Sequence, residues 1–188
     1  NIYNSYATGN INATGNSWIS VGGLCGVMRE EASIENCYNL ATIKAKNIKE
    51  DLGDADICCG GIVGQGMVNI NKCYNEGRIE VNGGENRILV GGILGSSSDT
   101  GNNHTIRNCY NNVEIKGVSK TYYQMYLGGI VGVLTTSNVY NCYNTGDIIG
   151  NEEKSDGYAI GGIIGTQRSN TTVNNLFNAG KVISEENS

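Results

Sequence analysis

Seven cysteines, one histidine and a short acidic run are the residues of this chain best suited to chemistry. Thiolates act as nucleophiles and metal ligands, and histidine is the usual general base. The histidine, His104, lies in the polar stretch 96–105, and no acidic residue recurs beside it to orient the ring. A Ser–His–Asp or Cys–His pair therefore cannot be inferred, and we expect His104 to be a solvent-exposed loop residue.

The acidic run is the second candidate for chemistry. Asp51, Asp54 and Asp56 cluster in residues 49–56 and have the oxygen ligands that Ca²⁺ prefers. The spacing is not that of a calcium loop, and the two positioned carboxylates that glycoside hydrolysis needs cannot be placed. We predict a solvated acidic loop, no metal, no other cofactor and no catalytic residue. The alternative is a polysaccharide-acting enzyme that uses these three aspartates.

Four of the cysteines share one column of an internal repeat, in which Ser5 and Leu176 also occur: Cys37, Cys73, Cys109 and Cys142. A column that accepts Ser or Leu favours a small packed side chain, and free cysteine packs as a small hydrophobe. Zinc ligands stacked in a line would not form a tetrahedron. The column predicts buried free thiols, while adjacent Cys58 and Cys59 leave a vicinal disulfide as the lesser alternative.

The repeat runs along the whole chain. Its aromatic position recurs at spacings of 32, 36, 36, 33 and 34 residues, at Tyr6, Tyr38, Tyr74, Tyr110, Tyr143 and Phe177. A second segment keeps the same period and reads Gly-Gly, two apolar residues or cysteine, then Gly, at residues 22–26, 60–64, 91–95, 128–132 and 161–165. Self-similarity at a period of 20–50 residues indicates a solenoid, a propeller or a repeat array.

Short strands position these columns. Ile79 and Val81 alternate with charged Arg78 and Glu80, which is the period of a strand with one solvent-facing side. The apolar column of Ile70 and the Gly-Gly segment supply two further strands per repeat. Three strands in about 34 residues, without helical periodicity, predict an all-β parallel β-helix of five to six coils. A right-handed winding is expected, and a propeller is the runner-up.

Two details of the coil stay open in the sequence. The asparagines that flank each aromatic residue suit stacked amide ladders, and they suit left-handed or Asx-turn geometry equally well. Counting alternation from Ile34 places Tyr38 inside, whereas the small residues of the Cys37 column favour that column inside. A bulge or corner between the two positions would reconcile the two interpretations.

Charge and length restrict the partners. The formal net charge is −5 without a basic run, which argues against nucleic acid and against an anionic membrane surface. No apolar run approaches the length of a transmembrane helix. Residues 1–188 begin and end in repeat register, so we expect one solenoid domain excised from a longer protein. Its uncapped terminal coils predict end-to-end self-association.

Five aromatic residues are the best candidates for a binding site. They fall in the variable stretch just before the Gly-Gly segment of different repeats: Trp18, Tyr122, Tyr123, Tyr126 and Tyr158. Corresponding stretches of a solenoid lie on one side of the rod, and exposed aromatics stack on sugar rings or anchor protein partners. The alternative is that they cover the edge of the core.

The Gly-Gly segments, together with stretches such as Tyr74 to Ile79 and Tyr143 to Ile148, resemble the GLUG-motif repeats over essentially the whole chain. Repeats of that family occur in large bacterial surface and secreted proteins, including adhesin-like proteins and non-catalytic regions of IgA1 metallopeptidases. The resemblance implies an extracellular, wall-attached parent protein with flanking domains. It implies a structural or adhesive module that contacts a host protein or glycan. It transfers no catalytic residues, so we predict a non-enzyme, with a carbohydrate-binding module as the alternative.

Overall fold

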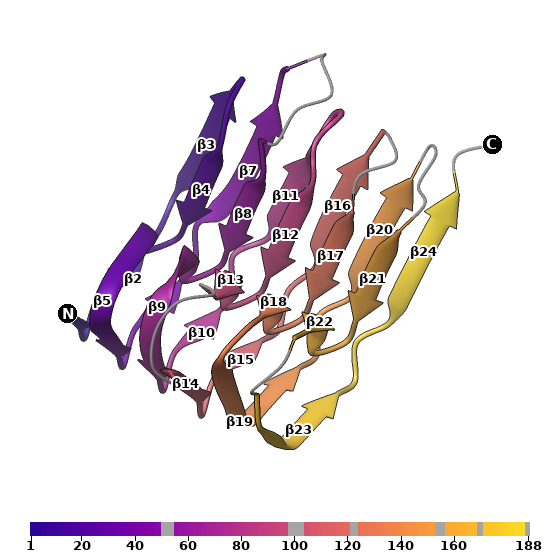
Figure 1. Ribbon diagram of the computed structural model, residues 1–188. Coiled ribbons are helices and arrows are strands. Elements are labelled where there is room, and N and C mark those ends of the chain that lie inside the picture. The colour runs from indigo at the N-terminus through magenta and orange to yellow at the C-terminus, as the bar shows by residue number, and fades with distance from the viewer. Residues whose placement is uncertain (50–54, 98–103, 121–123, 153–156, 169–170, 187–188) are drawn as a thin grey trace.

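The computed structural model describes residues 1–49, 55–97, 104–120, 124–152, 157–168 and 171–186, and these form an all-β solenoid (Figure 1). Every strand pair in these ranges is parallel, and each strand pairs with its equivalent in the next coil. The predicted parallel β-solenoid of about 34 residues per coil is therefore confirmed. Its strands form three sheets, which we call outer, middle and basal.

The outer sheet has six strands and the middle sheet has five. The outer sheet consists of β3 (Asn10–Gly15), β7 (Thr42–Asn47), β11 (Ile79–Asn82), β16 (Ile115–Ser119), β20 (Ile148–Glu152) and β24 (Val182–Glu186). The middle sheet consists of β4 (Ile19–Gly22), β8 (Ile57–Gly60), β12 (Ile88–Gly91), β17 (Met125–Gly128) and β21 (Tyr158–Gly161). The two sheets pack face to face around a shared core, and both run along the length of the solenoid in Figure 1.

The basal sheet joins three stacks of strands. Strands that begin within or just after the Gly-Gly segment are β5 (Cys25–Glu35), β9 (Val63–Asn71), β13 (Leu94–Ser97), β18 (Val131–Leu134) and β22 (Ile164–Gln167). Strands of the returning side are β1 (Ile2–Tyr3), β14 (His104–Arg107), β19 (Ser137–Asn144) and β23 (Val173–Asn178). Two-residue strands carry the repeated Tyr: β2 (Tyr6–Ala7), β6 (Tyr38–Asn39), β10 (Tyr74–Asn75) and β15 (Tyr110–Asn111).

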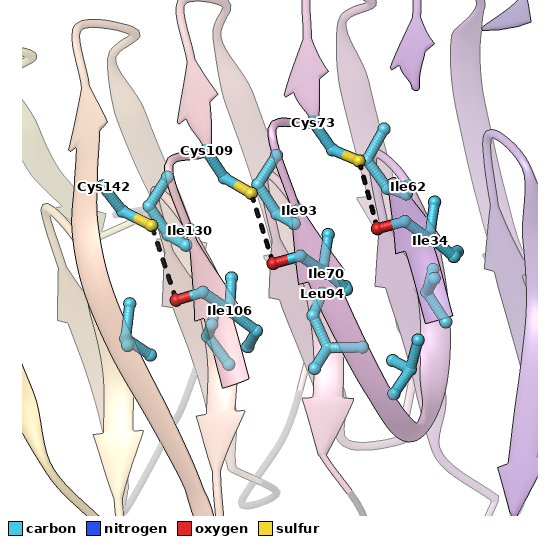
Figure 2. Packing of buried hydrophobic residues seen from close by; sticks show 14 of the residues in the cluster. Ile34, Ile62, Ile70, Cys73, Ile93, Leu94, Ile106, Cys109, Ile130 and Cys142 are labelled. Atoms are coloured by element: carbon cyan, nitrogen blue, oxygen red, sulfur yellow. Dashed lines mark hydrogen bonds between the residues drawn. The ribbon is translucent and has the colours of Figure 1, made fainter. Parts of the chain in front are cut away.

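Two apolar cores run along the solenoid. One fills the space between the outer and middle sheets and contains Ile43, Ile57, Ile79, Ile88, Ile115 and Met125. The other lies inside the basal sheet and contains Ile34, Ile62, Ile70, Ile93, Ile106 and Ile130 beside the cysteine column (Figure 2). The predicted apolar columns are thus in register, with Ile43, Ile79 and Ile115 on successive strands. Their burial away from water is the main stabilising term of the fold.

A left-handed residue at one corner decides which side chains face inward. The residue before the cysteine column has a positive φ, which is 49° for Asn4 in the first coil. In the later coils it lies between 52° and 55°, at Asn36, Lys72, Asn108, Asn141 and Asn175. This conformation resets the alternation, so Ile34 and Cys37 both face the core while Tyr38 faces outward. The parity count that placed Tyr38 inside is wrong, and the predicted corner explains why.

The cysteine column forms a stack of buried thiols (Figure 2). All seven cysteines of the chain lie in described residues and all are free, so the vicinal disulfide alternative is wrong. The thiol of Cys109 donates to the carbonyl oxygen of Arg107 at 3.0 Å, and a longer contact of 3.8 Å reaches the carbonyl of Ile70 in the preceding coil. The thiols therefore pack as small core residues, as the column predicted.

The two asparagine columns have different roles. Asn36 and its equivalents take the left-handed corner, whereas the asparagine after the tyrosine is buried and forms an amide ladder. Asn75 donates to Asn111 at 2.8 Å, and Asn111 donates to Asn144 at 2.7 Å. Both interpretations of the asparagines are confirmed, one for each column.

Candidate functional site

The Gly-Gly segment makes the corner between the middle sheet and the basal sheet. The last glycine of each segment packs against the backbone of a middle-sheet strand. An ideal Cβ on Gly95 would lie 2.6 Å from the backbone nitrogen of Cys59, and one on Gly132 would lie 2.6 Å from that of Val90. No side chain fits at these positions, so the two sheets meet closely and their solvent-facing sides enclose an angle.

A pocket of about 200 Å³ lies in this angle. Its lining combines one aromatic side chain, charged and polar groups and a small apolar floor: Trp18, Asp56, Gln65, Arg87, Leu89, Ser96, Ser97, Val133 and Arg168. An aromatic face beside hydrogen-bonding groups is the usual composition of a site for a small polar ligand such as a sugar. The pocket is therefore the candidate functional site.

Trp18 forms one wall of the pocket. It directly precedes β4, is the only tryptophan of the chain, and remains 53% exposed. A large aromatic side chain that is half-exposed at the mouth of a pocket can stack on a ligand without first leaving the core. Of the three predicted aromatic residues that the structure describes, Trp18 is the one that lines this pocket.

Asp56 and Arg87 form the charged part of the site. Arg87 donates from Nε and Nη2 to the two carboxylate oxygens of Asp56, at 2.8 and 2.5 Å. The hydrogen bond from Arg87 to Asp56 raises the pKa of the guanidinium. Asp56 is almost fully buried, so its prediction as part of a solvated acidic loop is wrong, whereas Asp51 and Asp54 lie outside the described residues. The two residues pair because Arg87 follows Asp56 by one coil.

The floor of the angle is apolar. Cys58, Leu89 and Val133 form a small buried cluster against which Tyr126 packs. Burial raises the pKa of the Cys58 thiol to about 12, and the charge of Asp56 adds to this rise. A thiol with this pKa stays protonated near neutral pH and is a poor nucleophile. Cys58 is therefore a structural residue of the floor.

The predicted aromatic residues divide between the two faces of the middle sheet. Trp18 and Tyr126 lie on the side of the pocket, although they belong to coils that are separated by two others. Tyr158 is in register with Met125 of the core between the outer and middle sheets, so it belongs to the opposite face. Tyr122 and Tyr123 lie outside the described residues. Ligand binding by these residues stays a prediction.

Sequence reasoning missed the polar half of the pocket. Gln65 and Ser96 directly follow the last glycine of their Gly-Gly segments and are in register with each other on β9 and β13. Ser97 accepts a hydrogen bond from the backbone nitrogen of Thr135 at 2.6 Å and donates to its carbonyl. The sequence did contain a signal for Gln65 and Ser96. Each follows the last glycine of its segment by one position, and the glycine corner directs both side chains into the angle that holds the pocket.

His104 is buried at the start of β14, in register with Ser137 of β19. The expectation of a solvent-exposed loop histidine is therefore wrong. Because β14 pairs with β19 of the next coil, the end of the polar stretch 96–105 becomes part of the basal sheet. The part of the chain that the structure describes contains no group of three or more His, Cys, Asp and Glu side chains that could hold a metal ion.

The repeated tyrosines form a ladder on the outside of the basal sheet. Tyr6, Tyr38, Tyr74, Tyr110 and Tyr143 stack with ring centroids 4.8–5.1 Å apart and planes within 7° of parallel. Their faces are therefore covered by one another, which leaves the ring edges to solvent. The ladder stabilises the stacking of coils and offers few free ring faces for a ligand.

The comparisons with known proteins agree with this geometry. The model of the GLUG motif matches residues 123–149, which include the Gly-Gly segment and the Tyr-Asn segment of one repeat. Comparison with curated proteins and with solved structures gave no match. None of the described segments forms a helix able to cross a membrane. The same two segments recur in the other coils, so the parallel β-solenoid is built from repeats that resemble the matched GLUG motif.

Proposed function

We propose that this repeat region is a rigid spacer of a bacterial cell-surface or secreted protein, which displays neighbouring domains and contacts a host glycan or protein. The observation that carries the spacer role is the continuity of the ladders. Buried amides, thiols and exposed tyrosines each contact their equivalents in the next coil. These contacts between successive coils oppose bending of the rod, and each coil adds about 4.8 Å to its length.

The extracellular location rests on the family resemblance and on the fit of the structure to it. Seven free thiols would be unusual in an oxidising compartment. Six of them are buried, however, so oxidants reach them poorly. A parent protein exposed on an anaerobic bacterium suits this combination.

The spacer role is tested by changing the number of coils in the parent protein. A second copy of residues 76–111, inserted after residue 75, adds one coil in register. We expect a domain beyond the repeat to become more accessible to antibodies on intact cells, and removal of one coil to have the opposite effect. Equal accessibility at all lengths would contradict a spacer.

A glycan contact is the second part of the proposal, and the Trp18 pocket favours it. Trp18 offers a ring face, while Gln65, Ser96 and Arg87 offer hydrogen-bonding groups next to it. Burial of Cys58 as a protonated thiol and the pairing of Asp56 with Arg87 favour binding over catalysis. A polysaccharide-acting enzyme would release new reducing ends from a bound glycan, which an assay of sugar release would detect.

A glycan and matrix-protein array, probed with the wild type, Trp18→Ala and Tyr158→Ala, tests this contact. The two substitutions remove comparably exposed aromatic side chains from opposite faces of the middle sheet. We expect Trp18→Ala to abolish binding to unsulfated glycans and Tyr158→Ala to preserve it. Equal loss in both variants, or no binding by the wild type, would contradict the glycan contact, and only the spacer role would remain.

A further inference from the structure

The outward side of the outer sheet carries a concentration of positive charge. Two adjoining grooves of about 460 and 390 Å³ lie on it and share Lys46 and Asn82 in their linings. Six cationic side chains line the two grooves: Lys44, Lys46, Lys49, Arg78, Lys116 and Lys120. The carboxylates in the same linings are Glu80 and Glu85, so six positive and two negative charges leave a formal +4, in a chain of net −5.

The strand register explains how these charges come together. Lys44, Glu80 and Lys116 occupy one row across β7, β11 and β16, and Lys46, Asn82 and Val118 occupy the next outward row. The two lysines of the first row are two coils apart, about 9.6 Å along the solenoid axis. Asn82 and Val118 have shorter side chains than the neighbouring lysines. The part of the second row that they occupy therefore forms the floor of a groove that runs along the axis.

Part of this charge is not neutralised within the described structure. Glu80 is bound by Lys44 at 3.0 Å and Arg78 at 3.2 Å, and Arg78 also bonds to Glu114. Among the described residues, Lys46, Lys116 and Lys120 form no ion pair. The hydrogen bond from Lys44, together with the charges of Arg78 and Lys116, lowers the pKa of Glu80, as expected in a positive environment.

The linings indicate the chemistry of the ligand. Asn12, Thr14 and Asn82 line the larger groove and can form hydrogen bonds with hydroxyl groups. The described linings contain no aromatic side chain on which a nucleic-acid base could stack. Five of the six cations are lysines, which act as point charges and suit tetrahedral anions, whereas planar carboxylates favour the fork of arginine. An extended, hydroxyl-rich chain with sulfate groups fits these features.

We propose that the adjoining grooves of the outer sheet bind a linear sulfated glycan, with Lys46, Lys116 and Lys120 as the principal sulfate contacts. This site is separate from the Trp18 pocket, because the outer and middle sheets pack face to face and present opposite sides to solvent. The overall negative charge of the chain limits non-specific attraction of polyanions, so the groove supplies selectivity.

The test is calorimetric titration of the full 188-residue chain with a heparin oligosaccharide as the probe. The groove variant carries Lys46→Gln, Lys116→Gln and Lys120→Gln. The matched control carries Lys72→Asn, Arg107→Gln and Lys181→Gln, which remove three exposed or corner charges outside the two groove linings and change the net charge equally. We expect the groove variant to bind at least about tenfold more weakly and the control to bind like the wild type, because several surface charge contacts are lost together.

The remaining arms distinguish this site from the Trp18 pocket and from general charge attraction. We expect Trp18→Ala to bind heparin like the wild type, and affinity to fall as salt rises. Equal weakening in the groove and control variants would overturn the proposal, since it would show a general charge effect. Tighter binding of a hyaluronan oligosaccharide or of single-stranded DNA would overturn the sulfated ligand. Absence of heparin binding by the wild type would overturn the site. Circular dichroism of each variant verifies the fold.

Discussion

Gly92 and Asn111 touch across the interior of the solenoid, and this contact joins the two halves of the repeat. An ideal Cβ on Gly92 would lie 2.6 Å from Cγ of Asn111 and 2.1 Å from the carbonyl oxygen of Gly129. Gly61 and Asn75 have the same relationship one coil earlier. The Gly-Gly segment and the Tyr-Asn segment keep the same period because the buried amide ladder occupies the space that a side chain on the second glycine would need.

This contact predicts that Gly92→Ala is strongly destabilising. The added methyl group meets backbone and a hydrogen-bonded amide, neither of which can move without breaking the ladder. We expect the free energy of unfolding to fall by about 3 kcal/mol in urea denaturation. Gly15→Ala is the control, because its Cβ would lie at an ordinary 3.4 Å from the side chain of Ile19. Similar stability of the two variants would contradict the packing.

The amide ladder is expected to depend on each of its members. Asn111 accepts from Asn75 and donates to Asn144, and all three are fully buried. Asn111→Ala leaves a donor and an acceptor unsatisfied, which predicts a loss of about 2–5 kcal/mol in unfolding free energy. Asn112→Ala removes the adjacent, exposed asparagine and should change stability little. A neutral Asn111→Ala would show that the ladder contributes nothing.

Thiol accessibility gives a direct test of the cysteine stack. Cys25 is half-buried and the other six cysteines are buried. In the folded protein, we expect a thiol reagent such as DTNB to react rapidly with one cysteine per chain, and with all seven after denaturation. Cys25→Ser should remove the rapid reaction. Rapid reaction of more than one thiol in the native protein would mean that the stack is open to solvent.

Alkaline pH is expected to destabilise the protein in a defined window. Burial raises the pKa of the Cys58 thiol from 9.0 to about 12, and desolvation with the nearby charge of Glu76 raises the pKa of Tyr110 from 10.0 to about 12. The unfolded chain releases these protons first, so the folded state is fully stable below about pH 9 and loses stability as pH approaches 12.

Urea midpoints measured between pH 8 and pH 12 should therefore be level at first and then fall. Cys58→Ser should reduce the fall, since Ser20 occupies the same register in the preceding coil. A tyrosinate titration should show Tyr110→Phe removing the most alkaline step. A constant midpoint up to pH 12 would contradict the burial of these groups.

Most of the fold was predictable because residues of the same type recur at equivalent positions of successive repeats. Ile43, Ile79 and Ile115 recur at the repeat period and meet in register, so the parallel stacking followed from spacing alone. The facing of Tyr38 did not follow, because a left-handed Asn36 resets the alternation and a single sequence shows Asn without its φ. The candidate site was predicted only through Trp18. Gln65, Ser96 and Ser97 come from the basal sheet, and their convergence with Trp18 depends on the angle at the glycine corner.

The sequence by itself determined the period, the all-β class and the three apolar columns, since copies of one residue type 32–36 positions apart can meet only if the coils stack in register. Tertiary structure alone decided which columns share a face. It buried His104, paired Asp56 with Arg87 and separated Tyr158 from Trp18. It also gathered lysines from two coils, and an arginine from the coil between them, onto the outer sheet. These relationships depend on side-chain direction and on corner geometry, which spacing along the chain does not contain.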